Sequence, residues 1–265
     1  MRSDTTNTVP SELYDEDYFL TACEGYAEFN SSAGEYLSRR LEEALRVAGV
    51  TADMRILDVG CGRGEVLRQI WRLGAQPLGV DYAAVAVRFS RQVMAAETED
   101  VIPVQQANAR QLPFLSGTFD RVLMLDIVEH LYPPELTEAL AEAYRVLKPG
   151  GRLVVHTAPN VWYDHYAYRG VRLVRRWLGQ GDKYPRNPRA FLVPENVQVH
   201  VNEQSWLSLR RNLRRAKFTG IQVWLSTPEQ HRRENLLFRV LRVILFEWWP
   251  FRWFFQREVF AVGEK

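Results

Sequence analysis

The sequence predicts an α/β fold in which helices cover both faces of a doubly wound, parallel sheet. Between residues 55 and 157, short apolar runs alternate with longer stretches of helical periodicity. The apolar runs are nearly continuous, as in strands that are buried on both faces. Strands that alternate with helices form β-α-β units, and these units build a parallel sheet.

The elements can be placed from the spacing of apolar residues along the chain. Residues 14–47 show helical spacing, and Gly49 follows them as a C-cap glycine. We then expect strands at residues 55–59, 77–80, 101–105, 120–125 and 152–157, separated by helices at 65–73, 83–96 and 134–147.

The regular alternation ends after Pro159. In this second part we expect helices at residues 163–178, 203–216 and 235–249, and strands at 221–225 and 258–262. Insertions of this length inside a compact domain usually carry function.

The composition is that of a globular protein. Of the 265 residues, 46% are hydrophobic and 25% are charged, which excludes collagen-like and disordered classes. The two cysteines, Cys23 and Cys61, are too few for a four-ligand zinc site, and we expect no metal. Low cysteine use, a polar N-terminus and the lack of a long uncharged apolar run favour a cytoplasmic location.

The net charge of +2 conceals a division between the two halves of the chain. Residues 1–150 carry 14 basic and 23 acidic side chains, whereas residues 151–265 carry 20 basic and 9 acidic ones. This asymmetry indicates either an anionic partner for the second half or two solvated faces that partly neutralise each other.

A glycine-rich turn after the first expected strand carries the strongest functional signal. Gly60, Gly62 and Gly64 allow a tight turn and a close approach of a ligand to the backbone. In a dinucleotide fingerprint, a further glycine stands where this chain has Glu65, whose charge at a helix N-terminus would repel a pyrophosphate. An amino-acid moiety fits better, with Asp58 facing its ammonium group.

Polar residues also follow the next expected strands, at the same edge of the sheet. Asp81 can accept hydrogen bonds from both hydroxyls of a ribose, or it can cap the helix that follows. Asn108, next to Ala109, can pair with the edge of an adenine. Asp126 follows the fourth expected strand and begins an Asp-Ile-Val-Glu-His-Leu segment.

Together these motifs resemble the class I S-adenosylmethionine-dependent methyltransferases. The match rests on the Leu-Asp-Val-Gly-Cys-Gly-x-Gly loop at 57–64, Gly-Val-Asp at 79–81 and Leu-Lys-Pro-Gly-Gly at 147–151. Within that class, residues 126–131 and Thr-Ala-Pro-Asn at 157–160 look like ubiquinone-biosynthesis-type small-molecule O-methyltransferases. The aromatic N-terminal segment around Tyr14, Tyr18 and Phe19 is similar to the lid of members from bacterial glycan and natural-product pathways.

The resemblance implies a fold, a cofactor and a set of cofactor-binding residues. The fold would be one Rossmann-like domain with a seven-stranded sheet and an antiparallel last strand. It would comprise an N-terminal helical lid at 1–48, a cofactor-binding core at 49–158, a substrate-side insertion at 159–200 and a C-terminal part at 201–265 with a helical insertion at 226–256. S-adenosylmethionine would be held by these residues: Asp58, Gly60 and Gly62 for the methionine part, Asp81 for the ribose, Asn108 and Ala109 for the adenine, Asp126 closing the site, and Cys61 and Tyr82 as further contacts. The family often has aspartate at the position of Asn108. The asparagine at this position would therefore weaken the one contact with the adenine.

Five histidines offer candidate bases for a hydroxyl acceptor. His130 follows the fourth expected strand and is the first candidate, with Glu129 beside it. His156 and His200 come next, and His165 and His231 have weaker cases. For each of them the alternative is a structural histidine.

The acceptor is expected to be an oxygen of a small-molecule, glycan or lipid-linked compound. The Asp/Asn-Pro-Pro-aromatic loop of amino-directed nucleobase enzymes is missing, which makes nucleic acid an improbable partner. An RNA methyltransferase that uses the basic half, and a non-catalytic S-adenosylmethionine-binding protein, remain the alternatives. The sequence leaves the oligomeric state open.

Two aromatic and arginine-rich stretches, residues 163–178 and 235–255, suit contact with a membrane surface. In the first stretch, Arg169, Arg172 and Arg176 are expected on one helical face, and Val171, Val174 and Leu178 on another. The alternative is that the two stretches pack on each other as a cap over the substrate.

Overall fold

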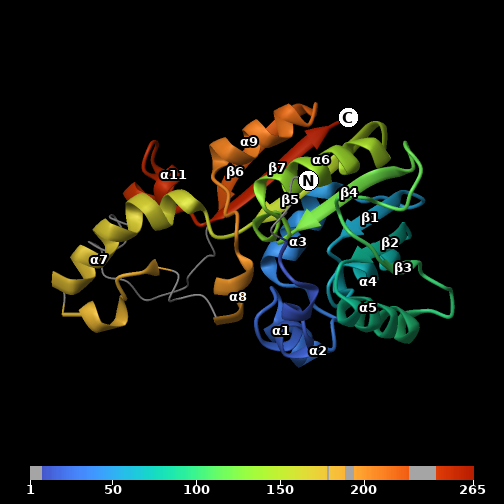
Figure 1. The fold of residues 1–265 in the computed structure, drawn as a ribbon, viewed down its shortest axis with the longest axis horizontal. Coiled ribbons are helices and arrows are strands. Elements are labelled where there is room, and N and C mark those ends of the chain that lie inside the picture. The colour runs from blue at the N-terminus through green and yellow to red at the C-terminus, as the bar shows by residue number, and fades with distance from the viewer. Residues whose placement is uncertain (1–7, 178, 189–193, 227–242) are drawn as a thin grey trace, which may run out of the picture.

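A computed structural model describes residues 8–177, 179–188, 194–226 and 243–265 and shows a seven-stranded sheet between layers of helices (Figure 1). The strands are β1 (Arg55–Val59), β2 (Gln76–Asp81), β3 (Val104–Gln106), β4 (Phe119–Leu125), β5 (Leu147–Thr157), β6 (Thr219–Ser226) and β7 (Glu258–Glu264). Their order is β3-β2-β1-β4-β5-β7-β6, with β7 antiparallel to both of its neighbours and the other pairs parallel. The expected fold class is confirmed.

The helices that the structure describes fill the connections between these strands. They are α1 (Glu16–Thr21), α2 (Tyr26–Ser32), α3 (Arg39–Ala48), α4 (Glu65–Arg72), α5 (Ala84–Glu97), α6 (Pro133–Val146), α7 (Tyr168–Trp177), α8 (Pro194–Val199), α9 (Trp206–Arg215) and α11 (Arg252–Phe255), with short turns η1 (Ser11–Leu13), η2 (Val128–His130), η3 (Tyr163–Ala167) and η4 (Gly181–Lys183).

The N-terminal stretch of helical spacing differs most from the sequence prediction. It forms three separate helices, because Gly25 and Gly34 adopt positive φ angles of 74° and 78° that interrupt the helical path. Gly49 caps α3 in the left-handed conformation, as expected. Residues 8–28 lie near the carboxyl ends of β1 and β4, where Phe19 contacts Arg63 and Tyr14 contacts His130, and are called the lid below.

The core forms on both faces of the sheet because successive strand residues point to opposite sides. Leu57, Val122 and Leu153 face α6 and α9, whereas Ile56 and Leu123 face α3 and α4. All five side chains are completely buried. This two-sided burial explains why the strands read as continuous apolar runs in the sequence.

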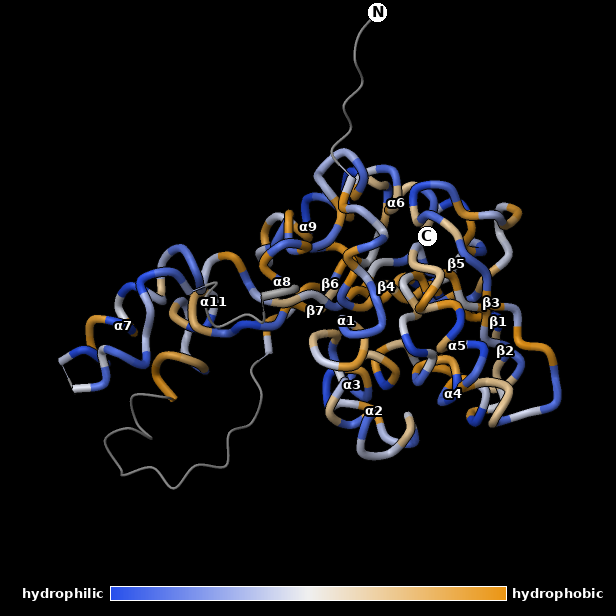
Figure 2. Tube along the Cα trace, turned by 60° about the horizontal axis from the view of Figure 1, so that its bottom comes forward, coloured by the Kyte–Doolittle hydropathy of each residue, from blue (hydrophilic) through white to orange (hydrophobic). Residues whose placement is uncertain are grey.

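Residues 163–188 and 243–256 form an arm that projects beyond the edge of the sheet formed by β6 and β7 (Figures 1 and 2). Its two segments pack together, since Tyr166 meets Phe254 edge-on at 5.9 Å, and Trp162, just before the first segment, stacks on Phe254 at 5.5 Å. Asn160 fixes the base of the arm, since its Nδ2 donates to the backbone oxygens of Trp253 and Gln256 at 2.9 Å each. Residues 235–242 of the second expected helix lie outside the described residues; residues 243–247 are helical. His231 also falls outside.

None of the helices in the described part of the chain combines the length and the apolar character needed to span a bilayer.

Candidate active site

The functional site lies where the chain reverses direction across the sheet. After β1 the chain moves outward to β2 and β3, and it then returns to add β4 on the other side of β1. Open α/β sheets bind ligands in the crevice at the carboxyl ends of the strands that flank such a point. A cavity of about 2180 Å³ opens there, lined by the glycine loop, the ends of β2 and β4, the lid and part of the arm.

The glycine loop follows β1 with the conformation its sequence requires. Gly60, Gly62 and Gly64 have φ angles of 78°, 52° and 87°. A Cβ on Gly60 would lie 3.1 Å from the side chain of Ile127, and one on Gly64 would lie 2.7 Å from the Cα of Ser90. The loop therefore runs close to its neighbours and presents bare backbone to the cavity.

Two acidic residues stand beside this loop, at the ends of β1 and β2. Asp81 accepts hydrogen bonds from the backbone N–H groups of Gly62 at 3.0 Å and Ala83 at 2.8 Å, so it ties the loop to the start of α5. Burial raises the pKa of Asp81 to about 6, with its backbone hydrogen bonds acting in the opposite direction. Burial, together with the nearby Glu65 and Asp81, raises the pKa of Asp58 to about 8.

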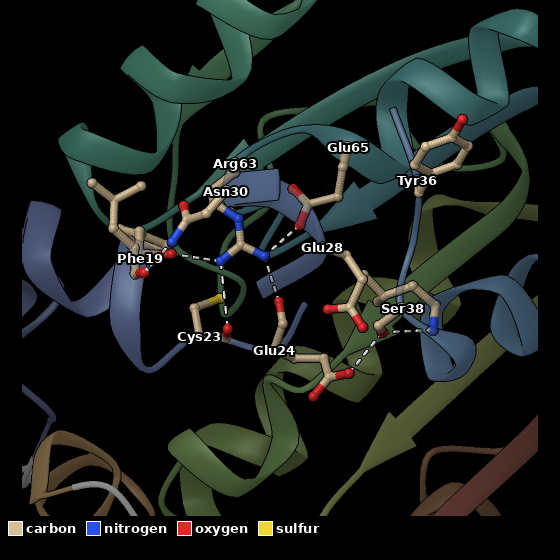
Figure 3. A network of polar contacts seen from close by, with 12 residues as sticks. Phe19, Cys23, Glu24, Glu28, Asn30, Tyr36, Ser38, Arg63 and Glu65 are labelled. Atoms are coloured by element: carbon tan, nitrogen blue, oxygen red, sulfur yellow. Dashed lines mark hydrogen bonds and ion pairs between the residues drawn. The ribbon is translucent and has the colours of Figure 1, made fainter. Parts of the chain in front are cut away.

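The lid is attached to the glycine loop through Arg63, which the sequence reasoning did not identify (Figure 3). Its buried guanidinium donates to the backbone oxygens of Phe19, at 2.6 Å, and of Glu24. The same group lies 2.5 Å from the carboxylate of Glu65 and over the ring of Phe29. Glu65 is therefore paired with Arg63, although its charge still reaches Asp58, and the repulsion of a pyrophosphate expected from the sequence stays a prediction.

Asp126 occupies the turn after β4 in a left-handed conformation, with φ of 52°. Its Oδ1 lies 2.9 Å from Nδ1 of His156. Although burial opposes the effect, the contact with His156 and the more distant Arg40 hold the pKa of Asp126 below its ordinary value. Its buried Oδ2 has no hydrogen-bond partner among the described residues, and the residue lines the cavity. A carboxylate oxygen left in this state suits a polar or cationic ligand group.

The candidate bases differ in where the structure places them. His130 and His200 line the cavity, and their rings meet edge-on at 4.9 Å. His156 is completely buried, packs against Phe260 and does not line the cavity. The structure thus assigns it contact with Asp126 and not with an acceptor. His165 is exposed on the arm.

Glu129 and Tyr14 complete the surroundings of His130. Glu129 accepts hydrogen bonds from Oγ1 of Thr157 at 2.8 Å and from the backbone of Ala158. Burial, followed by repulsion from Asp126, raises its pKa well above the usual range. The hydroxyl of Tyr14, from the lid, lies 3.1 Å from Nδ1 of His130. The aromatic pattern of the N-terminal segment indicated a lid, but no local signal showed which tyrosine would reach this histidine.

The imidazole of His130 is neutral in this environment. Burial, and then the neighbouring His200, lower its pKa to about 3. If Nδ1–H donates to Tyr14, Nε2 keeps a lone pair and can accept a proton. Burial and the surrounding carboxylates raise the pKa of Tyr14, so its hydroxyl stays protonated and holds one ring orientation.

Glu129, His130 and His200 are also the residue types that bind metal ions. One ligand atom from each lies within 4.8 Å of the others. Glu129 and His130 are, however, already engaged with Thr157 and Tyr14. The sequence did not predict this grouping, because the three residues meet only when residues 200–202 fold against η2, where the backbone oxygen of Glu129 accepts from Val201 and Asn202.

The remaining expected cofactor residues lie around the same cavity. Tyr82, Asn108 and Ala109 line it, with Asn108 accepting from the backbone of Arg110. Cys61 contributes backbone to the loop, while its buried side chain contacts Ser90 on α5. These positions agree with the expected site, and direct contact with a cofactor stays a prediction.

Comparisons with known proteins agree with this geometry. Residues 57–155 match the protein family described as Methyltransferase domain. Over 175 residues the chain is 29% identical to a ubiquinone biosynthesis O-methyltransferase of Rhodopseudomonas palustris (strain BisB18), a match covering 62% of each protein. It is 31% identical over 147 residues to the chloroplastic tocopherol O-methyltransferase of Arabidopsis thaliana, covering 52% of this chain and 40% of that one. The matches thus span less than two thirds of these curated relatives.

A solved structure shares the fold over nearly the whole chain. It belongs to the complex between the Haloferax volcanii Trm112 methyltransferase activator and a candidate methyltransferase, with a TM-score of 0.61, 16% identity and 96% coverage of both chains. Residues 57–155 match a methyltransferase domain, and the sheet order and the glycine loop agree with the class I, S-adenosylmethionine-dependent form of that domain. Its cofactor is S-adenosylmethionine, and the bare backbone of the loop, buried Asp58 and the unpartnered oxygen of Asp126 fit a cationic amino-acid ligand.

Proposed function

We propose that this chain transfers a methyl group from S-adenosylmethionine to a hydroxyl oxygen of a small-molecule, glycan or lipid-linked acceptor. The observation that carries the proposal is the position of His130, which borders the same cavity as the glycine loop and Asp126. The names of the relatives, which are O-methyltransferases of ubiquinone and tocopherol biosynthesis, support an oxygen acceptor.

The residues of the site divide the work of such a transfer. Bound S-adenosylmethionine supplies an activated methyl group on a sulfonium sulfur. Asp58, Asp81 and the loop backbone hold and orient it, and orientation alone can supply ~7–11 kcal/mol of the barrier. The acceptor oxygen forms its bond to the methyl carbon while the carbon–sulfur bond breaks and leaves its electron pair on sulfur. The hydroxyl proton passes to Nε2 of His130.

The lid and the histidine pair protect this chemistry from water. Tyr14, Tyr18 and Phe19 border the cavity from the lid, and Tyr18 and Phe19 are buried. Excluding water strengthens the interaction of Asp58 and Asp126 with a cation, because the local dielectric constant is low.

The proposal is tested by incubating the full chain with methyl-labelled S-adenosylmethionine and panels of phenolic, glycan and prenylated hydroxyl acceptors. We expect stoichiometric formation of S-adenosylhomocysteine and of an acceptor that carries the label on oxygen. Label found on RNA, or on nitrogen of every accepted compound, would contradict the proposal.

A further inference from the structure

The arm presents an apolar surface to solvent that no other described part of the chain covers. On α7 and the adjoining η3, Tyr166, Leu173 and Trp177 are exposed, the last two at 70% and 87%. Trp248, Trp249 and Phe251 are exposed in the second segment of the arm, with Trp249 at 68%. Exposed apolar groups of this size gathered on one projection mark an interaction surface. These six residues are called the aromatic surface.

The aromatic surface differs from the aromatic contacts that hold the arm together. Trp253 stacks on Trp206 at 5.5 Å, and Trp162 stacks on Phe254, so these rings are used inside the protein. The contact between Tyr166 and Phe254 shows that the two stretches pack on each other, whereas their role as a substrate cap stays a prediction. Of the outer residues, Tyr166 and Trp249 each meet an inner ring edge-on at 5.9 Å, yet most of their surface stays exposed.

Arginines border the aromatic surface on α7, in an arrangement that corrects the sequence prediction. Arg172 does not lie on a free face with Arg169 and Arg176: its Nε donates to the backbone oxygen of Tyr184 at 3.1 Å. Arg169 and Arg176 are exposed, and they flank Leu173 and Trp177 at helical spacing. The solvent face of α7 is therefore apolar and cationic at once.

The arm as a whole is positively charged, like the solvent face of α7. Its described residues, together with 160–162 and 257, contain eight arginines and lysines but only three aspartates and glutamates. Tryptophans beside arginines, on a projection that has no spanning helix, suit the interface of an anionic bilayer. A single-stranded RNA can stack its bases on tryptophans, but it has no use for an exposed aliphatic side chain such as Leu173.

We propose that the arm docks on the surface of an anionic lipid bilayer through the aromatic surface, with Arg169 and Arg176 meeting the headgroups. The cavity of the active site reaches into the arm, where Val171, Val174 and Phe255 line it. Docking would bring a bilayer-borne acceptor to this opening. That last step rests on the proposed function, whereas docking itself does not.

Sedimentation with phosphatidylcholine vesicles, with and without phosphatidylglycerol, tests the proposal without any turnover. We expect the full chain to pellet with anionic vesicles and much less with neutral ones. The variant Leu173→Ser/Trp177→Ser/Trp248→Ser/Trp249→Ser should lose at least tenfold in vesicle affinity. Its matched control is Tyr36→Ser/Leu73→Ser/Val101→Ser/Leu115→Ser, which removes four exposed apolar side chains from the rest of the molecule. This control should bind like the unaltered chain.

The charges are tested separately by Arg169→Glu/Arg176→Glu. Because each basic residue near an anionic surface contributes about 1 kcal/mol, and the glutamates add repulsion, this change should weaken binding to anionic vesicles by at least about 30-fold. The control is Arg211→Glu/Arg214→Glu on the exposed side of α9, which leaves the arm intact. All variants should bind S-adenosylmethionine normally, which shows that they are folded.

Three results would overturn docking on lipid. The first is that the control variants weaken vesicle binding as much as the arm variants do. The second is that the chain associates with itself and does not bind vesicles, and that the aromatic variant abolishes this self-association. The surface would then be an interface between copies of the chain. The third is binding to RNA, but not to vesicles, that falls steeply with salt. If docking holds but no hydroxyl acceptor is methylated, only the proposed function fails.

Discussion

Nη2 of Arg63 lies 2.5 Å from Oε1 of Glu65, inside the loop that the sequence marks only by its glycines. Arg63 is 1% exposed and Glu65 is 5% exposed. The pair links two structural roles. Glu65 begins helix α4, and Arg63 donates a hydrogen bond to the backbone of the lid.

Replacing Arg63 by alanine should release the lid and destabilise the protein. The change leaves Glu65 buried without its partner and removes the donors for Phe19 and Glu24, a type of loss that costs about 3–5 kcal/mol. We expect a lower unfolding midpoint and rapid proteolytic cleavage between residues 15 and 38. The control Arg46→Ala removes an exposed arginine paired with Glu43 and should leave both readouts unchanged. Equal protease resistance in the two variants would show that Arg63 does not anchor the lid.

Gly64 tests the geometry of the loop itself. Gly64→Ala places a Cβ 2.7 Å from the Cα of Ser90, in addition to forcing alanine into a positive φ. We expect a loss of about 3 kcal/mol in the free energy of unfolding. Gly117→Ala has the same backbone strain, at φ of 69°, but open space around the Cβ, and should cost about 1 kcal/mol. Similar denaturation midpoints for the two variants would contradict the close approach of α5 to the loop.

His130→Ala should lower kcat by about 10²–10⁴-fold while changing the affinity for S-adenosylmethionine little, because a base acts on the acceptor. His165→Ala, on the exposed side of the arm, is the matched control. Unchanged turnover with the methylated acceptor would remove His130 as the base.

Tyr14→Phe tests how His130 is oriented. The hydroxyl lies 3.1 Å from Nδ1, and its loss frees the ring to change tautomer. We expect a smaller fall in kcat than for His130→Ala, with KM for the cofactor unchanged. A double variant no slower than His130→Ala alone would show that Tyr14 acts through His130, whereas additive losses would contradict this.

The affinity for S-adenosylmethionine should rise with pH. The pKa values of Asp58 and Asp81, raised to about 8 and 6, mean that the free protein holds protons that the unfolded chain has already lost above about pH 4. The stability of the free protein should therefore fall as the pH rises from about 4 to about 8. A cationic ligand favours the carboxylates, so binding releases protons and tightens by up to about tenfold per pH unit. Calorimetry in buffers of different ionisation enthalpy measures this release, and pH-independent binding without proton release would contradict it.

Most of the sheet and the cofactor loop could be predicted from the sequence because their signals are local. Apolar runs such as 55–59 mark strands, and the glycines mark the turn. The roles of Arg63 and Tyr14 could not be predicted, because each depends on contacts between distant segments. Asp126 was located, but its pairing with His156 depends on the register between β4 and β5, which no local pattern reveals.

The arm shows a different limit of sequence reasoning. Helical spacing placed Arg172 with Arg169 and Arg176, yet the turn at Gly181 brings the backbone of Tyr184 against it. Which face of an amphipathic helix is buried depends on what packs there, and the spacing alone does not specify it.

Calorimetric titration of the full chain with S-adenosylmethionine tests the central claim most directly. We predict one site per chain, with affinity reduced about 10–100-fold in Asp81→Ala, since this change removes the carboxylate that we expect to accept both ribose hydroxyls. The control Asp100→Ala removes the same charge from an exposed position and should bind as the unaltered chain does. Absence of binding by the unaltered chain, or equal affinities for the two variants, would contradict the assignment of this cavity as the cofactor site.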